Sequence, residues 1–152
     1  MKRSDVNALV RSATACFAVH GWALPPRPRW DVTDFGLGDW NRHGLVLVNL
    51  TEQPEYCEKL MYARQGMTTP CHCHHRKKED IICRWGALRV WLWAGPPEAS
   101  TGPPLTPEVV LGEVSTYNDD AHDNVFADPR VGRMPAIDED EPPVVRLVWE
   151  TA

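Results

Sequence analysis

The 152-residue chain lacks both a long apolar run and an excess of positive charge. No stretch has the roughly 20 consecutive apolar residues that a membrane-spanning helix needs, and the first residues do not form an export signal. Its 16 Lys and Arg stand against 21 Asp and Glu, a formal net charge of −5. Because nucleic acids attract basic surfaces, this balance argues against them as partners. We therefore expect neither a membrane nor a nucleic acid as partner.

Cysteine is scarce and odd in number, since the chain has five. At least one thiol therefore has no intramolecular partner, and without an export signal we expect a reducing, cytoplasmic compartment. The composition, 43% hydrophobic and 24% charged, is that of a globular protein. A chain of this length is most simply one domain, so we take residues 1–152 as a single unit.

The chain shows no internal repeat and no alternation of strands with helices. A helical apolar stripe runs over about residues 4–20, with Ser4 as the expected cap and Gly21 after its end. Short apolar runs separated by turn residues follow, which predicts an all-β architecture after this helix. Surface loops are expected at 94–107 and 128–143, the second with a solvated acidic cluster. The expected strands are 44–50, 57–64, 69–75, 79–83, 87–93, 109–116 and 144–149.

One stretch, residues 66–86, carries the chemistry. His72 and His74 are two apart, so on a strand their side chains point the same way. A polar turn after them, in which we expect a solvated Arg76-Lys77-Lys78, would return the chain so that Glu79 begins the next strand. Two imidazoles and one carboxylate at a single point suit a divalent transition metal with open positions. An alternative is a zinc or copper site in which the thiols of Cys71, Cys73 and Cys83 bind the metal beside the histidines.

The spacing of the same stretch matches a known pattern. Gly66, His72, His74, Glu79 and Gly86 follow one another as Gly, five residues, His, one, His, four, Glu, six, Gly. This resembles the first motif of the cupin superfamily, whose fold is a β-barrel of the jelly-roll type. The second cupin motif supplies a further histidine after a Pro-x-Gly turn, and no histidine lies between residues 75 and 122. The fourth ligand is therefore missing or replaced; water or His122 could take its place.

Further blocks resemble the D-lyxose isomerase family in order over nearly the whole chain. They include Lys2-Arg-Ser-Asp-Val-Asn, Trp30-Asp-Val-Thr-Asp-Phe-Gly-Leu-Gly-Asp, Glu58-Lys-Leu-Met, Pro70-Cys-His-Cys-His, Gly112-Glu-Val-Ser-Thr-Tyr-Asn-Asp-Asp, Asp123-Asn-Val-Phe and Asp140-Glu-Pro-Pro. Two departures stand out: the segments before Trp30 and after Trp93 are shorter than in the family. The second of these lacks the Pro-Gly turn and the fourth histidine, so the barrel could be incomplete.

The resemblance implies a homodimeric, metal-dependent aldose–ketose isomerase that converts a small sugar, D-lyxose to D-xylulose, through an enediolate on a divalent ion such as Mn²⁺. It implies that His72, His74 and Glu79 bind the metal and that Lys59 and Glu113 line the sugar pocket. We expect Glu113 to act as the base and Lys59 to polarise a substrate oxygen. Asp123 is a weaker substrate-binding candidate.

Other classes of function stay open at this point. The shortened segments favour a degenerate cupin that binds metal or sugar without turnover. Two histidines and a carboxylate could instead hold Fe²⁺ in an oxygenase. Glu113 and Lys59 could also be ordinary solvated strand residues, and Asp123 part of a polar loop.

Overall fold

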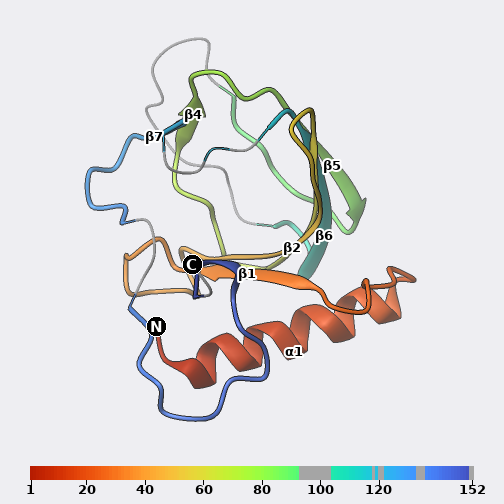
Figure 1. Cartoon of the computed structure of the whole chain (residues 1–152), viewed down its shortest axis with the longest axis vertical. Helices are drawn as coiled ribbons and strands as arrows, with labels where there is room; N and C mark the ends of the chain where they lie inside the picture. Colours follow the sequence, from red (N-terminus) through yellow and green to blue (C-terminus); the bar gives the residue numbers. More distant parts are fainter. Residues whose placement is uncertain (93–103, 118, 120–121, 133–135, 151–152) are drawn as a thin grey trace.

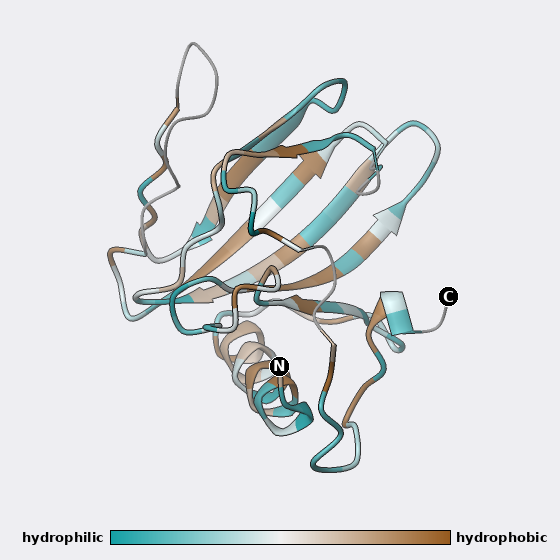
Figure 2. Ribbon diagram, turned by 90° about the vertical axis from the view of Figure 1, so that its left-hand side faces the viewer, coloured by the Kyte–Doolittle hydropathy of each residue, from teal (hydrophilic) through white to brown (hydrophobic). Residues whose placement is uncertain are grey.

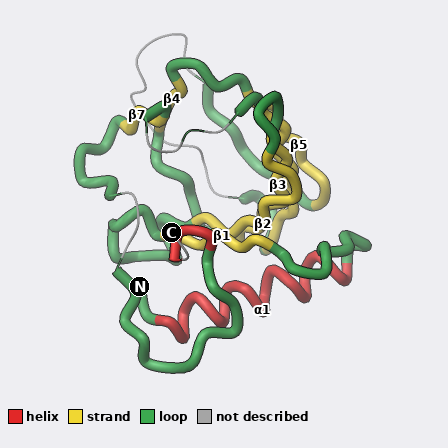
Figure 3. The backbone as a smooth tube through the Cα atoms, in the orientation of Figure 1, coloured by secondary structure: helices red, strands yellow, loops and turns green. Residues whose placement is uncertain are grey.

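The computed structural model describes residues 1–92, 104–117, 119, 122–132 and 136–150. One helix, α1 (Arg3–Val19), lies beneath a five-stranded antiparallel sheet in the order β1-β2-β3-β6-β5 (Figure 1). A two-stranded sheet, β4-β7, lies apart from it (Figure 3). The bounds are β1 (Arg29–Thr33), β2 (Leu45–Glu52), β3 (Cys57–Arg64), β4 (His72–His74), β5 (Glu79–Trp85), β6 (Glu108–Ser115) and β7 (Asn124–Phe126).

The predicted architecture, all-β after an N-terminal helix, is confirmed. No strand pairing joins the two sheets within the described residues, so they do not close into a barrel. No helix in the described part of the chain combines the length and apolar character that a membrane crossing requires.

Alternation along the strands gives the large sheet two different faces. One face packs on the apolar stripe of α1 and forms the main core (Figure 2). Phe17 is fully buried there, with its ring 6.3 Å from that of Trp30 and 6.5 Å from that of Tyr62. The opposite face is free of the helix and is available to carry polar groups.

The start of α1 differs from the prediction. The helix begins at Arg3 after Lys2, and Ser4 does not cap it. Instead, the backbone N–H of Arg3 donates to the carbonyl of Asp138 at 2.8 Å, and the Ser4 N–H and hydroxyl donate to the carboxylate of Asp140 at 2.9 and 2.7 Å. Negative charge at a helix N-terminus is stabilising. The acidic cluster expected to be solvated is therefore docked on the helix.

Two predicted strands are wrong in the described residues. Residues 87–92 form no strand, and only an isolated bridge joins Leu88 to Pro104; the rest of that predicted strand and most of the loop at 94–107 lie outside the described part. The apolar run at 144–149 ends in a short 3₁₀ helix, η1 (Val148–Glu150). Leu147 is fully buried in the core there, so the apolar pattern reported burial rather than strand pairing.

The helix end and the main strands agree with the sequence. The chain leaves α1 at His20, and Gly21 takes a positive φ of 77°. The glycines that frame the metal stretch also have positive φ, 95° at Gly66 and 85° at Gly86. A Cβ on Gly86 would lie 2.8 Å from the carbonyl oxygen of Glu108, so a larger residue there would displace backbone. These glycines hold the strand ends that present the site.

Candidate metal centre and sugar pocket

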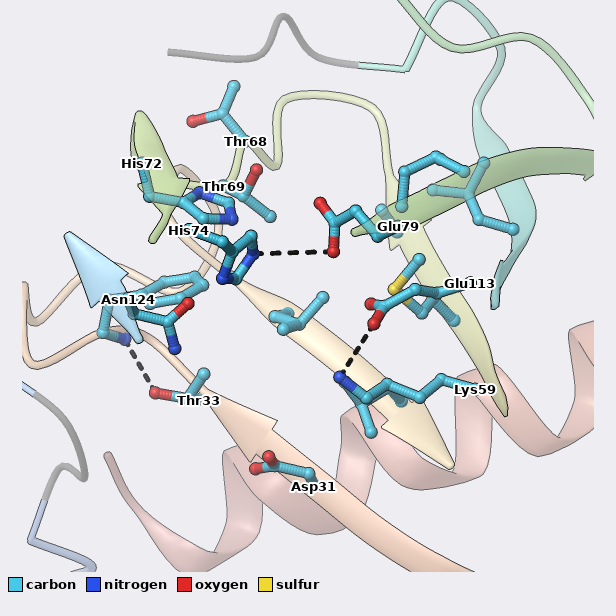
Figure 4. A pocket seen from close by; sticks show the side chains of 18 of the residues that line it. Asp31, Thr33, Lys59, Thr68, Thr69, His72, His74, Glu79, Glu113 and Asn124 are labelled. Carbon is cyan, nitrogen blue, oxygen red and sulfur yellow. Dashed lines mark hydrogen bonds and ion pairs between the residues drawn. The ribbon is translucent and has the colours of Figure 1, made fainter. Parts of the chain in front are cut away.

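A cavity of about 910 Å³ lies between the helix-free face of the large sheet and the small sheet. Its floor carries inward-facing residues of β1, β2, β3 and β6, and its other wall includes His72, His74 and Asn124. The volume is in the range of small-molecule sites. Figure 4 shows side chains from both sheets pointing into this space.

The three predicted ligands come together at one end of the cavity. His72 and His74 project the same way from β4, with ring centroids 5.2 Å apart, as the alternation of a strand predicts. Glu79 begins β5 and faces them. One donor atom from each of the three residues lies within 4.8 Å of the others. This group contains no thiol, and the five cysteines are free, with Cys71 buried and Cys73 and Cys83 exposed.

The surroundings of the two histidines show whether their ring nitrogens could bind a metal. His72 Nδ1 lies 2.9 Å from the carbonyl oxygen of Pro70; since a carbonyl only accepts, Nδ1 carries the proton and Nε2 keeps its lone pair. Both ring nitrogens of His74 are buried without a hydrogen-bond partner in the described structure. The nearest acidic atoms are Glu79 Oε2 at 3.5 Å and Asp123 Oδ2 at 3.6 Å. Buried polar atoms left unpaired are costly, so this donor set fits a divalent cation.

Lys77 is the residue that the sequence analysis missed. Its side chain is only 4% exposed, and its ammonium lies 2.8 Å from Glu79 Oε2 and 2.7 Å from Glu113 Oε1. Burial alone would lower the pKa of Lys77, but the charge of Glu113 and hydrogen bonds to both carboxylates outweigh it and raise the pKa. The prediction of a solvated cationic turn is wrong for this residue. A signal was present: Lys77 is two residues before Glu79, so in extended chain both face the same way.

Glu79 is ionised in this setting. Burial alone would raise the pKa of its carboxyl group, but the neighbouring His74 imidazole and the Lys77 ammonium outweigh burial and lower the pKa to about 2. An anionic carboxylate is the form that binds a cation. A divalent ion held by Glu79 would share this carboxylate with the Lys77 ammonium.

Glu113 and Lys59 lie together on the cavity floor. They are direct partners across β6 and β3, and Lys59 Nζ is 3.1 Å from Glu113 Oε1. Both side chains are 8% exposed, so neither is an ordinary solvated strand residue. The ion pairs from Lys59 and Lys77 both use Oε1 of this carboxylate.

Asp123 lies behind the metal group rather than in the pocket. It is 3% exposed, does not line the cavity, and accepts hydrogen bonds from the backbone N–H of Arg76 at 2.8 Å and of Lys77 at 2.9 Å. Burial would raise the pKa of its carboxyl group, but these N–H groups outweigh burial and lower the pKa. The geometry supports a role in holding the loop between His74 and Glu79. His122 is 78% exposed and bonds Asp119 at 3.0 Å, outside the cavity lining.

Known proteins with similar sequences are sugar isomerases. The D-lyxose/D-mannose isomerase of Escherichia coli O157:H7 is 30% identical, covering 93% of this chain and 94% of that protein. The enzyme of the same name from Serratia proteamaculans is 34% identical, covering 99% and 97%. The second alignment spans 223 positions, more than the 152 residues of this chain, so this chain lacks segments that its relative has.

Solved structures show the same fold. The L-ribose isomerase of Acinetobacter sp. DL28 in complex with L-ribose aligns with a TM-score of 0.68 at 16% identity, covering 91% of this chain and 98% of that one. The L-ribose isomerase of Geodermatophilus obscurus aligns with a TM-score of 0.69 at 17% identity, with the same coverage. The fold is therefore cupin-like, with sheets that do not close. A family model described as D-lyxose isomerase matches residues 27–103 and 98–150, and this chain belongs to that family.

Proposed function

We propose that this chain is a metal-dependent aldose–ketose isomerase that interconverts D-lyxose and D-xylulose and also accepts D-mannose. The observation that carries the proposal is the placement of Glu113, a buried carboxylate on the floor of the cavity whose far wall holds His72 and His74. A continuous chain of contacts, His74 to Glu79 to Lys77 to Glu113, links the metal group to this carboxylate.

The residues of the metal group would be His72 Nε2, His74 and Glu79, and Mn²⁺ is the ion we expect. A divalent ion held there supplies polarisation of the sugar carbonyl and stabilises negative charge on two adjacent oxygens. The chain's own residues position the sugar, exclude water and move the proton. In the described part of the chain, these three residues are the group that would hold the ion.

Glu113 is the proposed base. Oε1 is held by the two ammonium groups, so Oε2 is the oxygen available to take the proton from C2 and return one to C1. A second proton passes from the C2 hydroxyl to the C1 oxygen, so the aldehyde becomes an alcohol and C2 becomes the carbonyl. Lys59 and Lys77 stabilise the anionic base, and Lys59 can donate to a substrate oxygen.

The test uses the full chain supplied with Mn²⁺. Incubation with D-lyxose or D-mannose, followed by NMR, should show the ketose product, and in D₂O the product should carry deuterium at C1. Glu113→Gln should abolish turnover at unchanged metal content, whereas Glu55→Gln, at an exposed acidic residue outside the cavity lining, should not. The absence of ketose from both sugars would reject the isomerase.

The metal content of variants tests the metal site and distinguishes an isomerase from a non-catalytic metal-binding protein. His72→Ala and His74→Ala should each lose bound Mn²⁺, measured by elemental analysis after dialysis. His75→Ala is the matched control, because this neighbouring histidine is exposed and is not part of the group. Equal metal in all three variants would reject the site. Metal binding without any ketose would support the alternative of a degenerate, non-catalytic cupin.

A further inference from the structure

A row of polar residues crosses the mainly apolar floor of the cavity. Register places Glu113 on β6 opposite Lys59 on β3, and Lys59 opposite Asn49 on β2. Asp31 on β1 pairs with Leu47, so it is the diagonal neighbour of Asn49. All four polar residues line the cavity. Most of the other residues that line the floor are apolar, among them Leu45, Leu47, Met61, Ala63 and Leu111, although Thr33 on β1 and Glu52 on β2 are polar.

The far end of this row is a built feature. Trp149 Nε1 donates a hydrogen bond to Asp31 Oδ1 at 3.1 Å, and both residues line the cavity. Trp149 is carried by η1, which is tied to α1: the fully buried Arg3 guanidinium binds the Glu150 carboxylate. Three segments far apart in the sequence, β1, η1 and α1, therefore meet to fix the position of the Asp31 carboxylate. The proposed chemistry uses neither Asp31 nor Trp149.

The Asp31 carboxylate lies at the end of the pocket away from the proposed metal ligands (Figure 4). Figure 4 shows Asp31 at one end of the pocket and His72, His74 and Glu79 at the other, with the Lys59–Glu113 pair between them. Three strand spacings separate β1 from β6, about 14 Å between backbones before the side chains reach inward. A chain of hydroxyl groups that begins at Glu113 would run along the row toward Asp31.

We propose that Asp31 is a specificity-determining residue that accepts hydrogen bonds from the terminal hydroxyls of an open-chain sugar, and that Trp149 is the residue that positions it. This inference rests on the proposed function, since it takes the C1 and C2 end to lie at Glu113. Hydroxyl groups are donors that a carboxylate binds strongly, and the indole adds an apolar ring for the C–H groups of the sugar. A six-carbon chain reaches farther along the row than a five-carbon chain, so Asp31 favours hexoses.

The experiment compares two sugars that share configuration at C2, C3 and C4: D-mannose and D-lyxose, which lacks the sixth carbon. Asp31→Asn keeps an acceptor for Trp149 but removes the charge. It should lower kcat/KM for D-mannose about tenfold or more, mainly through KM, because hydrogen bonds to charged groups are the strong ones. The effect on D-lyxose should be less than about threefold by the same reasoning, since its chain is shorter.

Two further variants guard against a merely structural effect. Trp149→Phe keeps the ring but loses the donor, and should shift the ratio of the two sugars in the same direction. Asp31→Glu should restore part of the D-mannose preference. Asp39→Asn, at an exposed position outside the cavity lining, is the matched control and should leave both sugars unchanged. Equal losses on both sugars, or no loss on either, in Asp31→Asn and Trp149→Phe would overturn the inference.

A binding measurement with sugar analogues that cannot react tests the role of Asp31 independently of turnover. The alditols D-mannitol and D-arabinitol correspond to the two sugars but cannot isomerise, and their affinities for the Mn²⁺-loaded protein follow from calorimetric titration. The wild type should bind D-mannitol more tightly, and Asp31→Asn should remove the difference. If the wild type forms no ketose but shows this pattern, the isomerase proposal fails and the assignment of Asp31 stands. If ketose forms without the pattern, the assignment fails alone.

Discussion

Replacement of Arg3 by Met should destabilise the protein more than a surface substitution does. The side chain of Arg3 is 0% exposed, and its guanidinium binds Glu139 at 2.7 and 2.8 Å and both oxygens of Glu150. Breaking a fully buried pair by removing one partner costs about 3–5 kcal/mol. Glu139 is 48% exposed, so its carboxylate can turn into water after the substitution. Glu150 is only 10% exposed, so its carboxylate cannot turn into water. The unpaired Glu150 charge therefore accounts for most of the lost stability.

The magnitude sits at the low end of that range. Glu150 keeps a hydrogen bond from the Leu147 N–H at 2.7 Å and an ion pair with Arg146 at 3.5 Å, which reduce the cost of losing Arg3. We therefore expect Arg3→Met to lower the free energy of unfolding by about 3 kcal/mol. For a chain of this size the corresponding fall in Tm is about 6–12 °C. Urea unfolding followed by tryptophan fluorescence measures the free energy of unfolding, and a thermal scan with the same probe measures Tm.

The loss of stability caused by Arg3→Met should also depend on pH. Hydrogen bonds from Arg3 lower the pKa of Glu139; burial would raise the pKa of Glu150, but bonds from Arg3 and the Leu147 N–H outweigh it and lower that pKa too. A folded-state pKa below the ordinary 4.5 gives stability that is present above pH 4.5 and is lost as pH falls through the folded-state pKa. The wild type should therefore lose stability below pH 4.5 more steeply than Arg3→Met does.

Glu139→Gln serves as the control, since it removes only the exposed partner. A loss below about 1 kcal/mol for Arg3→Met, as for an exposed pair, would refute the reasoning that Glu150 is held buried by Arg3. So would a loss in Glu139→Gln equal to that in Arg3→Met.

Two other outcomes follow from the structure. Asp123→Asn, which weakens the support of the loop between His74 and Glu79, should lower Mn²⁺ affinity about 10- to 100-fold in a competition titration with a chelator, and unchanged affinity would contradict the role we give Asp123. Phe17→Ala should cost about 3–5 kcal/mol in urea unfolding, because a fully buried ring between Trp30 and Tyr62 is removed. A loss near 1 kcal/mol would mean that the core collapses around the gap.

Local patterns in the sequence predicted much of this molecule. The apolar stripe of α1, the apolar runs of β2, β3 and β6, and the spacing of His72, His74 and Glu79 are all short-range signals, and the structure reproduces each of them. The resemblance to the D-lyxose isomerase family was also readable from blocks of residues in order, and the family match confirms it. The roles of the individual site residues stay predictions.

The errors share one physical cause. The run at 144–149 is as apolar as a strand, but Leu147 is buried by packing on the core and the chain then turns into η1. The acidic cluster after Ile137 looks solvated in sequence, but it meets the start of α1 more than 130 residues earlier. An apolar residue favours burial and an acidic residue favours a positively charged or hydrogen-bonding partner. The sequence pattern does not show which distant segment provides that contact.

By itself, the sequence determined the helix, four strands of the large sheet (β2, β3, β5 and β6) and a group of three candidate ligands, because these patterns extend over only a few residues. Only the tertiary structure decided that Lys77 is buried between Glu79 and Glu113, and that Trp149 hydrogen-bonds to Asp31 at the far end of the cavity. Such contacts join β-strands and termini distant in sequence, and strand order and register set them. The chemistry of the pocket is therefore a property of how the sheet is assembled.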